Sequence, residues 1–150
     1  MSKTELHRPE RRPGANAAYG GVIIDGESRV LLREPKGHFG RYAWTFAKGG
    51  ANSGESAEAA ALREVREETG VEAEIVGELP GWFVGTTSDT KFFLMRPIRD
   101  HGDFHGETAA VRWASFEEAV ELIGETESIT GKARDLAVLA AARLAPRMTP

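Results

Sequence analysis

The chain has 150 residues, which is enough for one domain with a hydrophobic core, and its 41% hydrophobic and 28% charged residues are typical of a globular protein. It contains no cysteine, which excludes disulfide frameworks, thiolate zinc sites, iron–sulfur clusters and thiol nucleophiles. No run approaches 18 consecutive apolar residues and the N-terminus has no apolar stretch, so we expect neither a membrane span nor a signal peptide, and predict a cytoplasmic protein.

The net charge of −4 is unevenly distributed along the chain. Residues 1–16 carry four basic and two acidic side chains, a net charge of +2, which leaves −6 on residues 17–150. This balance lacks the strongly basic face that duplex nucleic acid requires, so we expect no binding of long nucleic acid. Residues 1–15 contain two prolines and no periodicity, which predicts a mobile N-terminal tail before a single domain over residues 16–147.

The first third of the chain predicts strands and loops. Residues 17–25 and 29–32 are rich in β-branched and apolar side chains on either side of Gly26, which predicts a pair of strands turned at that glycine. We then expect a polar loop, a short aromatic strand and a loop rich in Gly, Ser and Asn, at residues 33–41, 42–46 and 48–56.

The remaining elements alternate strands with helices. Good helix formers over residues 57–69, followed by Gly70, predict a helix that ends at this glycine. We expect strands at residues 71–79, 82–86, 91–95 and 110–114, the second and third forming a hairpin, and a loop at 97–107. Ser115 and Glu118 form a capping box for a helix over 116–123, and an amphipathic helix follows over 129–144. The order predicts an α/β (α+β) fold, in which helices pack on a mixed sheet.

Three glutamates share one face of the helix at residues 57–69. Glu64, Glu67 and Glu68 stand at i, i+3 and i+4, so they lie within an arc of about 100°. Such a run is ordinarily a solvated face, but here only Arg63 borders the acids, and like charges at this spacing cost roughly 0.2–0.5 kcal/mol per pair. Converging carboxylates are what a hard divalent cation needs, and Mg²⁺ fits best because it also binds phosphate oxygens.

The preceding loop is rich in glycine but is not a P-loop. Gly49, Gly50 and Gly54 would let a ligand or metal ion approach the main chain closely. A P-loop ends in Gly-Lys-Ser/Thr, whereas Gly54 is followed by Glu55 and a serine, so the phosphate-binding lysine is absent.

Together the loop and helix contain a complete motif that resembles the Nudix box of the Nudix hydrolases. It reads Gly49-x5-Glu55-x7-Arg63-Glu64-Val65-x-Glu67-Glu68-x-Gly70-Val71. The resemblance implies an α/β/α sandwich with a loop–helix–loop catalytic motif. It also implies hydrolysis of nucleoside diphosphates that are linked to another group.

The same resemblance implies roles for the residues of the motif. Three glutamates would bind Mg²⁺ or Mn²⁺ and act in catalysis, namely Glu64, Glu67 and Glu68. The backbone carbonyl of Gly49, or that of Lys48, would complete the metal site. A further ligand would come from Glu107, which could instead be an acid of the loop without a role. Arg63 would orient the glutamates and Glu55 would brace the loop. The base that accepts the proton of the attacking water would be Glu64 or Glu68, with Glu107 as an alternative.

Basic residues before the motif are candidates for binding substrate phosphates. They are Arg33, Lys36 and Arg41 of the polar loop, together with Lys48. A solvated polar loop is the alternative interpretation of this segment.

The substrate is predicted only as a class. Residues 44–50 resemble the segment before the box of diadenosine polyphosphate hydrolases and diphosphoinositol polyphosphate phosphohydrolases, although Ala47 stands where a proline is common. A dinucleoside polyphosphate or a related small phosphorylated molecule is therefore favoured. The alternatives are ADP-ribose, an oxidised nucleotide and, against the acidic balance of residues 17–150, an RNA 5′ end. An inactive binding protein of the same fold is disfavoured, because the box glutamates are all present.

Overall fold

The computed structural model describes residues 6–104 and 106–146. Its larger sheet has the strand order β1 (His7–Arg8), β6 (Trp82–Val84), β7 (Ser88–Asp100), β2 (Asn16–Ile23), β4 (Ala47–Gly49), and β5 (Val71–Glu78) pairs with β7 as well. Strands β2 and β7 run parallel and the other pairs run antiparallel, so the predicted mixed sheet is confirmed. A separate two-stranded sheet joins β3 (Val30–Pro35) to β8 (Thr108–Ala114).

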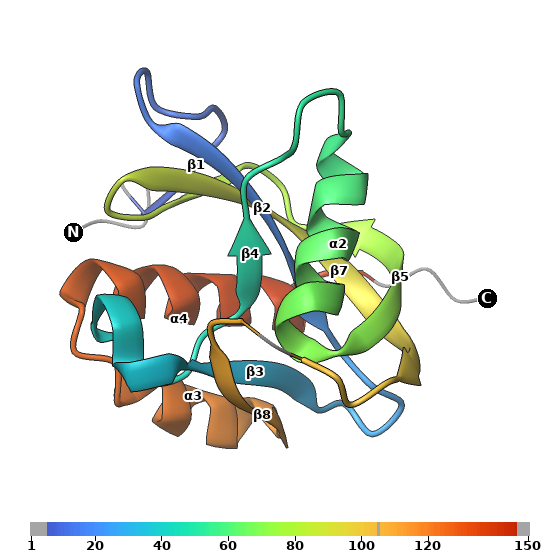
Figure 1. Cartoon of the computed structure of the whole chain (residues 1–150). Helices are drawn as coiled ribbons and strands as arrows, with labels where there is room; N and C mark the ends of the chain where they lie inside the picture. The colour runs from blue at the N-terminus through green and yellow to red at the C-terminus, as the bar shows by residue number, and fades with distance from the viewer. Residues whose placement is uncertain (1–5, 105, 147–150) are drawn as a thin grey trace.

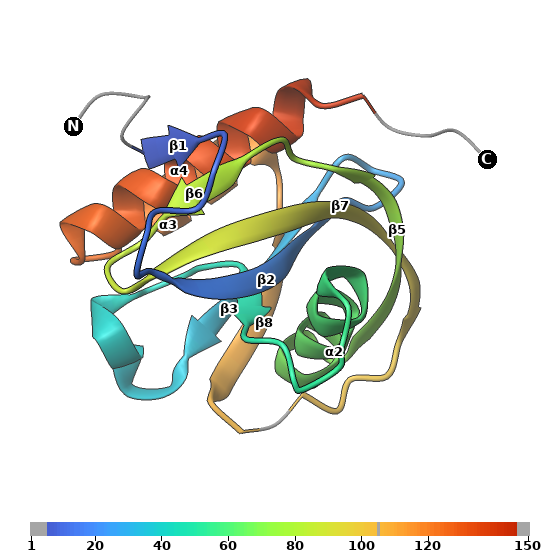
Figure 2. The same cartoon turned by 90° about the horizontal axis from the view of Figure 1, so that it is seen from above.

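Helices cover both faces of the larger sheet (Figures 1 and 2). Helix α2 (Ala57–Thr69) lies on one face, and α3 (Phe116–Gly124) and α4 (Ile129–Leu144) lie on the other. The predicted helices over 57–69 and 129–144 are confirmed, and the helix predicted over 116–123 is one residue longer and begins at the predicted capping box of Ser115 and Glu118. None of the helices among the described residues is long and apolar enough to cross a membrane.

The two cores follow from the alternation of side chains along β7. Phe92 and Leu94 belong to the core under α3 and α4, whereas Phe93 and Met95 belong to the core under α2. A strand buried on both faces needs apolar residues at consecutive positions, which explains the run of four. Gly21 of β2 lets α2 lie close to the sheet, because a Cβ there would lie 2.9 Å from Cγ2 of Val65 in this helix.

Several predicted strands and loops are wrong in partner or extent. The strand after Gly26 pairs with β8, and only an isolated Ile24–Val30 bridge joins it to the strand before the turn. Residues 42–46 form no strand apart from one bridge at Thr45, and the polar loop at 33–41 begins with the end of β3 and continues as the 3-10 helix η1 (Lys36–Arg41). The loop predicted over 97–107 begins later, because β7 continues to Asp100 along β5. Strand pairing is a tertiary choice, and local propensity does not specify it.

Residues expected to form a mobile tail contact the edge of the sheet. His7 of β1 pairs with Phe83 of β6. The carboxylate of Asp89, which is fully buried, accepts hydrogen bonds from the backbone N–H of Arg12 at 2.7 Å and from its Nε at 2.9 Å. A buried carboxylate needs such a partner, and periodicity does not reveal it. Residues 1–5 of the expected tail and the expected domain end at residue 147 lie outside the described residues.

Candidate active site

Helix α2 positions the acidic side chains of the motif. The side chain of Ser56 accepts a hydrogen bond from the backbone N–H of Ala59 and so caps the first turn. Gly70 ends the helix in the left-handed region, at φ 77°, which glycine adopts without strain. Val65 is fully buried against the sheet, and this orientation leaves the glutamate face of the helix beside β4.

The backbone of β4 passes directly against two of the glutamates. The N–H of Lys48 donates a hydrogen bond of 3.0 Å to Oε1 of Glu68. A Cβ on Gly49 would lie 2.3 Å from the carboxylate carbon of Glu64, so only glycine leaves room for this carboxylate. The main chain at Gly49 and the side chain of Glu64 therefore share one site, as a metal ion bound by both would require.

Arg63 connects the loop to the glutamates. Its Nε and Nη2 donate to the two oxygens of Glu55, at 2.8 and 2.9 Å. Its Nη1 donates to Glu64 at 2.9 Å and to Glu67 at 3.3 Å, and Nη2 also donates to the carbonyl of Gly50. One guanidinium thus fixes the loop, the helix and the direction of two carboxylates.

The position of Glu55 beside Arg63 lowers the pKa of its carboxyl group. The hydrogen bonds from Arg63 are the main cause that lowers the pKa of Glu55 to about 2, and a hydrogen bond from the backbone of Asn52 adds to the effect. The carboxylates of Glu55, Glu64 and Glu67 in turn raise the pKa of Arg63 above its usual value. Both groups are therefore ionised at neutral pH, and the loop is held by a permanent ion pair.

Glu68 lies in a more enclosed environment. Burial is the main cause that raises its pKa to about 7, while Arg33 and the Lys48 N–H oppose the rise. Nε of Arg33 lies 3.7 Å from Oε1 of Glu68. Arg33 is itself buried and donates to the hydroxyl of Thr108 and to the carbonyl of Glu107, so it joins β3 to β8 and to the glutamates.

The structure gathers the predicted carboxylate ligands around one cavity, which Gly49 does not line. Its lining residues are Glu64, Glu67, Glu68, Gly106 and Glu107. The candidate donors are all hard oxygens, which suits Mg²⁺ and Mn²⁺. Within residues 6–104 and 106–146 no three acidic or histidine side chains already converge on one point, so the carboxylates line the cavity without forming a closed coordination shell.

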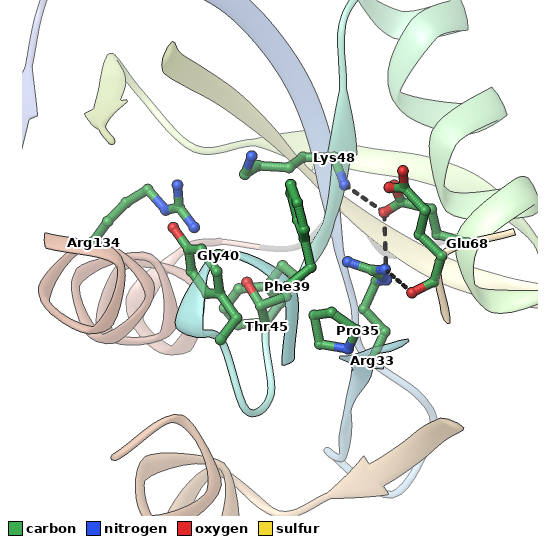
Figure 3. Close-up of a pocket in the computed structure, with 11 residues that line it drawn as sticks. Arg33, Pro35, Phe39, Gly40, Thr45, Lys48, Glu68 and Arg134 are labelled. Carbon is green, nitrogen blue, oxygen red and sulfur yellow. Dashed lines mark hydrogen bonds and ion pairs between the residues drawn. The ribbon is translucent and has the colours of Figure 1, made fainter. Parts of the chain in front are cut away.

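A second cavity, of about 190 Å³, continues from these glutamates (Figure 3). Of the predicted phosphate-binding residues, it brings Arg33 and Lys48 together with Glu68. Lys36 and Arg41 do not line it: Lys36 is exposed, and Nε of Arg41 lies 3.6 Å from a carboxylate oxygen of Glu127. Burial is the main cause that lowers the pKa of Lys48 below its usual value, and the charge of Arg134 acts in the same direction.

The cavity also contains charged residues that sequence reasoning missed. Arg134 of α4 lines it, and its Nε donates to Asp135, which accepts a second hydrogen bond from the hydroxyl of Thr45. The sequence position of Arg134 could have revealed it. Arg134 stands three residues after Gly131 and four before Val138, which places it on the buried face of the helix. An ionic residue on an apolar helix face needs a partner or a ligand.

Comparisons with known proteins decide the family. The family model of the NUDIX domain matches residues 15–135. This chain belongs to the NUDIX domain family. The resemblance that the motif carries is thereby confirmed, and the chain is a Nudix hydrolase, an enzyme with pyrophosphohydrolase activity. Nudix enzymes generally use divalent metal ions.

Individual proteins similar to this Nudix hydrolase agree with that assignment. It is 40% identical over 143 residues to the RNA pyrophosphohydrolase of Caulobacter vibrioides (strain NA1000 / CB15N), covering 80% of this chain and 81% of that protein. It is 35% identical over 146 residues to the RNA pyrophosphohydrolase of Roseobacter denitrificans, covering 82% and 88%. A solved NUDIX hydrolase from Nitrosomonas europaea superposes with a TM-score of 0.68 at 20% identity, covering 89% of this chain and 92% of that chain, and so shows the shared fold.

Proposed function

We propose that this Nudix hydrolase uses Mg²⁺ or Mn²⁺ and water to cleave a phosphoanhydride bond in a nucleoside diphosphate linked to another group. The favoured substrate is a dinucleoside polyphosphate or a related small phosphorylated molecule. The observation that carries the proposal is a pair of cavities that share Glu68 and Glu107, one lined by the glutamates and the other by Arg33 and Lys48. This arrangement suits a ligand that binds metal ions through phosphate oxygens and presents further negative charge to basic side chains.

The residues that would hold the metal ion are those of the glutamate cavity. Glu64, Glu67 and Glu68 would provide carboxylate oxygens, the carbonyl of Gly49 would add a main-chain oxygen, and Glu107 would contribute from the opposite wall. A bound divalent ion neutralises phosphate charge and lowers the pKa of a water molecule.

The chain itself has three tasks in this reaction. Arg63 holds Glu64 and Glu67 in direction and, through Glu55, fixes the loop. Arg33 and Lys48 would bind phosphate oxygens. One glutamate that is free of the metal ion would accept the proton of the attacking water, and Glu64, Glu68 and Glu107 are the candidates.

Substitution of the box glutamates tests the proposal. We expect Glu67→Gln and Glu68→Gln each to abolish turnover, because an amide cannot replace an anionic metal ligand, while the melting temperature stays near that of the wild type. Glu58→Gln, on the exposed first turn of the same helix, is the matched control and should retain activity. Chelation with EDTA should stop turnover, and added Mg²⁺ or Mn²⁺ should restore it. Near-normal activity of both variants would refute the assignment of these glutamates.

An RNA 5′ end is the second candidate substrate. The observation in its favour is the identity of 35–40% to two RNA pyrophosphohydrolases over most of both chains. A panel should compare dinucleoside polyphosphates, diphosphoinositol phosphates, ADP-ribose, oxidised nucleotides and a 5′-triphosphorylated RNA, with the products identified. The favoured proposal requires turnover of a small substrate at least as efficient as turnover of the RNA, and the reverse ranking would support the second candidate.

A further inference from the structure

The guanidinium of Arg134 is buried and incompletely paired. The side chain is 2% exposed, and its Nε donates to Asp135 at 3.0 Å. The other oxygen of Asp135 accepts from the hydroxyl of Thr45 at 2.6 Å. Nη2 of Arg134 is buried and has no hydrogen-bond partner among the described residues. A buried cationic N–H without an acceptor raises the free energy of the folded state. An anionic or polar ligand that accepts a hydrogen bond from this nitrogen would remove that cost.

Lys48 brings a second cation to the same place. Its backbone N–H is bonded to Glu68, but its side chain extends in the opposite direction, toward Arg134 (Figure 3). Both residues line the cavity that contains Glu68, and both also line a neighbouring cavity that reaches residues 86–88 and Ser128. The two cations therefore lie where the two cavities adjoin.

The carboxylates near the two cations either line the glutamate cavity or already accept hydrogen bonds. Three basic side chains, Arg33, Lys48 and Arg134, line the cavity of about 190 Å³ together with the two carboxylates of Glu68 and Glu107. Those two carboxylates also line the glutamate cavity, where a metal ion would engage them. Asp135 is a further carboxylate near Lys48, and both its oxygens already accept hydrogen bonds.

Rigid packing holds the guanidinium in place. Its carbon lies 5.3 Å from the centre of the Tyr42 ring, which makes a cation–π contact. Gly85 leaves space for the group, since a Cβ there would lie 2.9 Å from Nη1. A preformed cation with a free N–H, beside a lysine, is the arrangement that binds a phosphate group well.

We infer that Arg134 and Lys48 form a second anion-binding subsite, which holds a phosphate group of the substrate away from the bond that is cleaved. The inference rests on the proposed function and deepens it, because it requires a substrate with a phosphate beyond those at the glutamates. The side chains of Arg134 and Lys48, which line both cavities, bind the phosphate oxygens. Phe39, which Figure 3 shows between Lys48 and Arg33, lines both cavities.

Binding of inorganic pyrophosphate to the metal-free enzyme tests the subsite apart from catalysis. Isothermal titration calorimetry in EDTA should detect binding to the wild type. Lys48→Gln and Arg134→Gln should each weaken it by about tenfold or more, since each removes a charged hydrogen bond. Arg143→Gln is the matched control, because this arginine lies on the same helix, is exposed and does not line either cavity. Glu67→Gln should bind pyrophosphate at least as tightly as the wild type although it has lost turnover.

Three results would overturn the inference. They are the absence of binding to the wild type, unchanged binding in Lys48→Gln, and an equal loss in Arg143→Gln, which would indicate general electrostatic attraction. If Arg134→Gln does not fold, as judged by circular dichroism, the binding of pyrophosphate to Lys48→Gln decides the question. This substitution keeps the hydrogen bond from the backbone N–H of residue 48 to Glu68. None of these results bears on the metal-dependent turnover that tests the proposed function.

Discussion

Substitution of Gly49 by alanine separates activity from stability in this enzyme. The added Cβ would lie 2.3 Å from the carboxylate carbon of Glu64 and 2.5 Å from each of its oxygens. Ordinary van der Waals contact begins at 3.4 Å, so the carboxylate must move by about 1 Å or more. The group that moves is the end of a flexible side chain, and the unfolding free energy should therefore change little.

The expected loss of activity follows from that displacement. A misplacement of about 1 Å at a reacting centre costs on the order of 10²-fold in rate, which corresponds to roughly 2.7 kcal/mol of transition-state stabilisation. The assay is kcat/KM with saturating Mg²⁺, together with the melting temperature of the metal-free protein. Gly50→Ala is the matched control, because a Cβ at Gly50 meets nothing within 4 Å.

The comparison of the two alanine variants can refute the reasoning. If Gly49→Ala is as active as Gly50→Ala, the position of the Glu64 carboxylate does not matter to the reaction. If Gly49→Ala unfolds at a much lower temperature, the clash moves the backbone and not the carboxylate. Loss of activity with an unchanged melting temperature is the outcome that agrees with the structure.

Three further predictions concern the loop, the helix start and the buried ion pair. The pKa of Glu55 is lowered from 4.5 to about 2, so its ion pair with Arg63 stabilises the fold above about pH 4.5, and this contribution is lost as the pH falls toward 2. Urea unfolding of the metal-free protein should show Glu55→Gln less stable than the wild type at neutral pH, with the difference shrinking near pH 2, and a constant difference would contradict this reading. Ser56→Ala should lower the unfolding free energy by about 1 kcal/mol through loss of the N-cap, and a change below a few tenths would mean that the cap is redundant. Asp135→Asn should lower it by about 3 kcal/mol, because Arg134 keeps a buried charge without its counterion, and a loss under 1 kcal/mol would show that water or another group compensates.

Local sequence was sufficient to predict helix α2 and the motif that it carries. Good helix formers between Ser56 and Gly70 determine where α2 begins and ends, and a period of 3.6 residues places Glu64, Glu67 and Glu68 on one face. Since these interactions all lie within a few residues of one another, the sequence predicts them without knowledge of the fold. The same holds for the capping box at Ser115.

Tertiary structure alone decided which strands pair and which distant charges meet. The partner of β3 is β8, some 80 residues away, and the strand next to β3 in sequence lies in another sheet. Arg134 reaches the site only because α4 packs beneath the sheet, and Lys48 turns toward it while its backbone faces Glu68. The sequence by itself therefore determined which acidic side chains share one face of α2. The role of Arg134 could be inferred only from the tertiary structure, because the free-energy cost of a charged side chain depends on its burial and on the partners that the fold places around it.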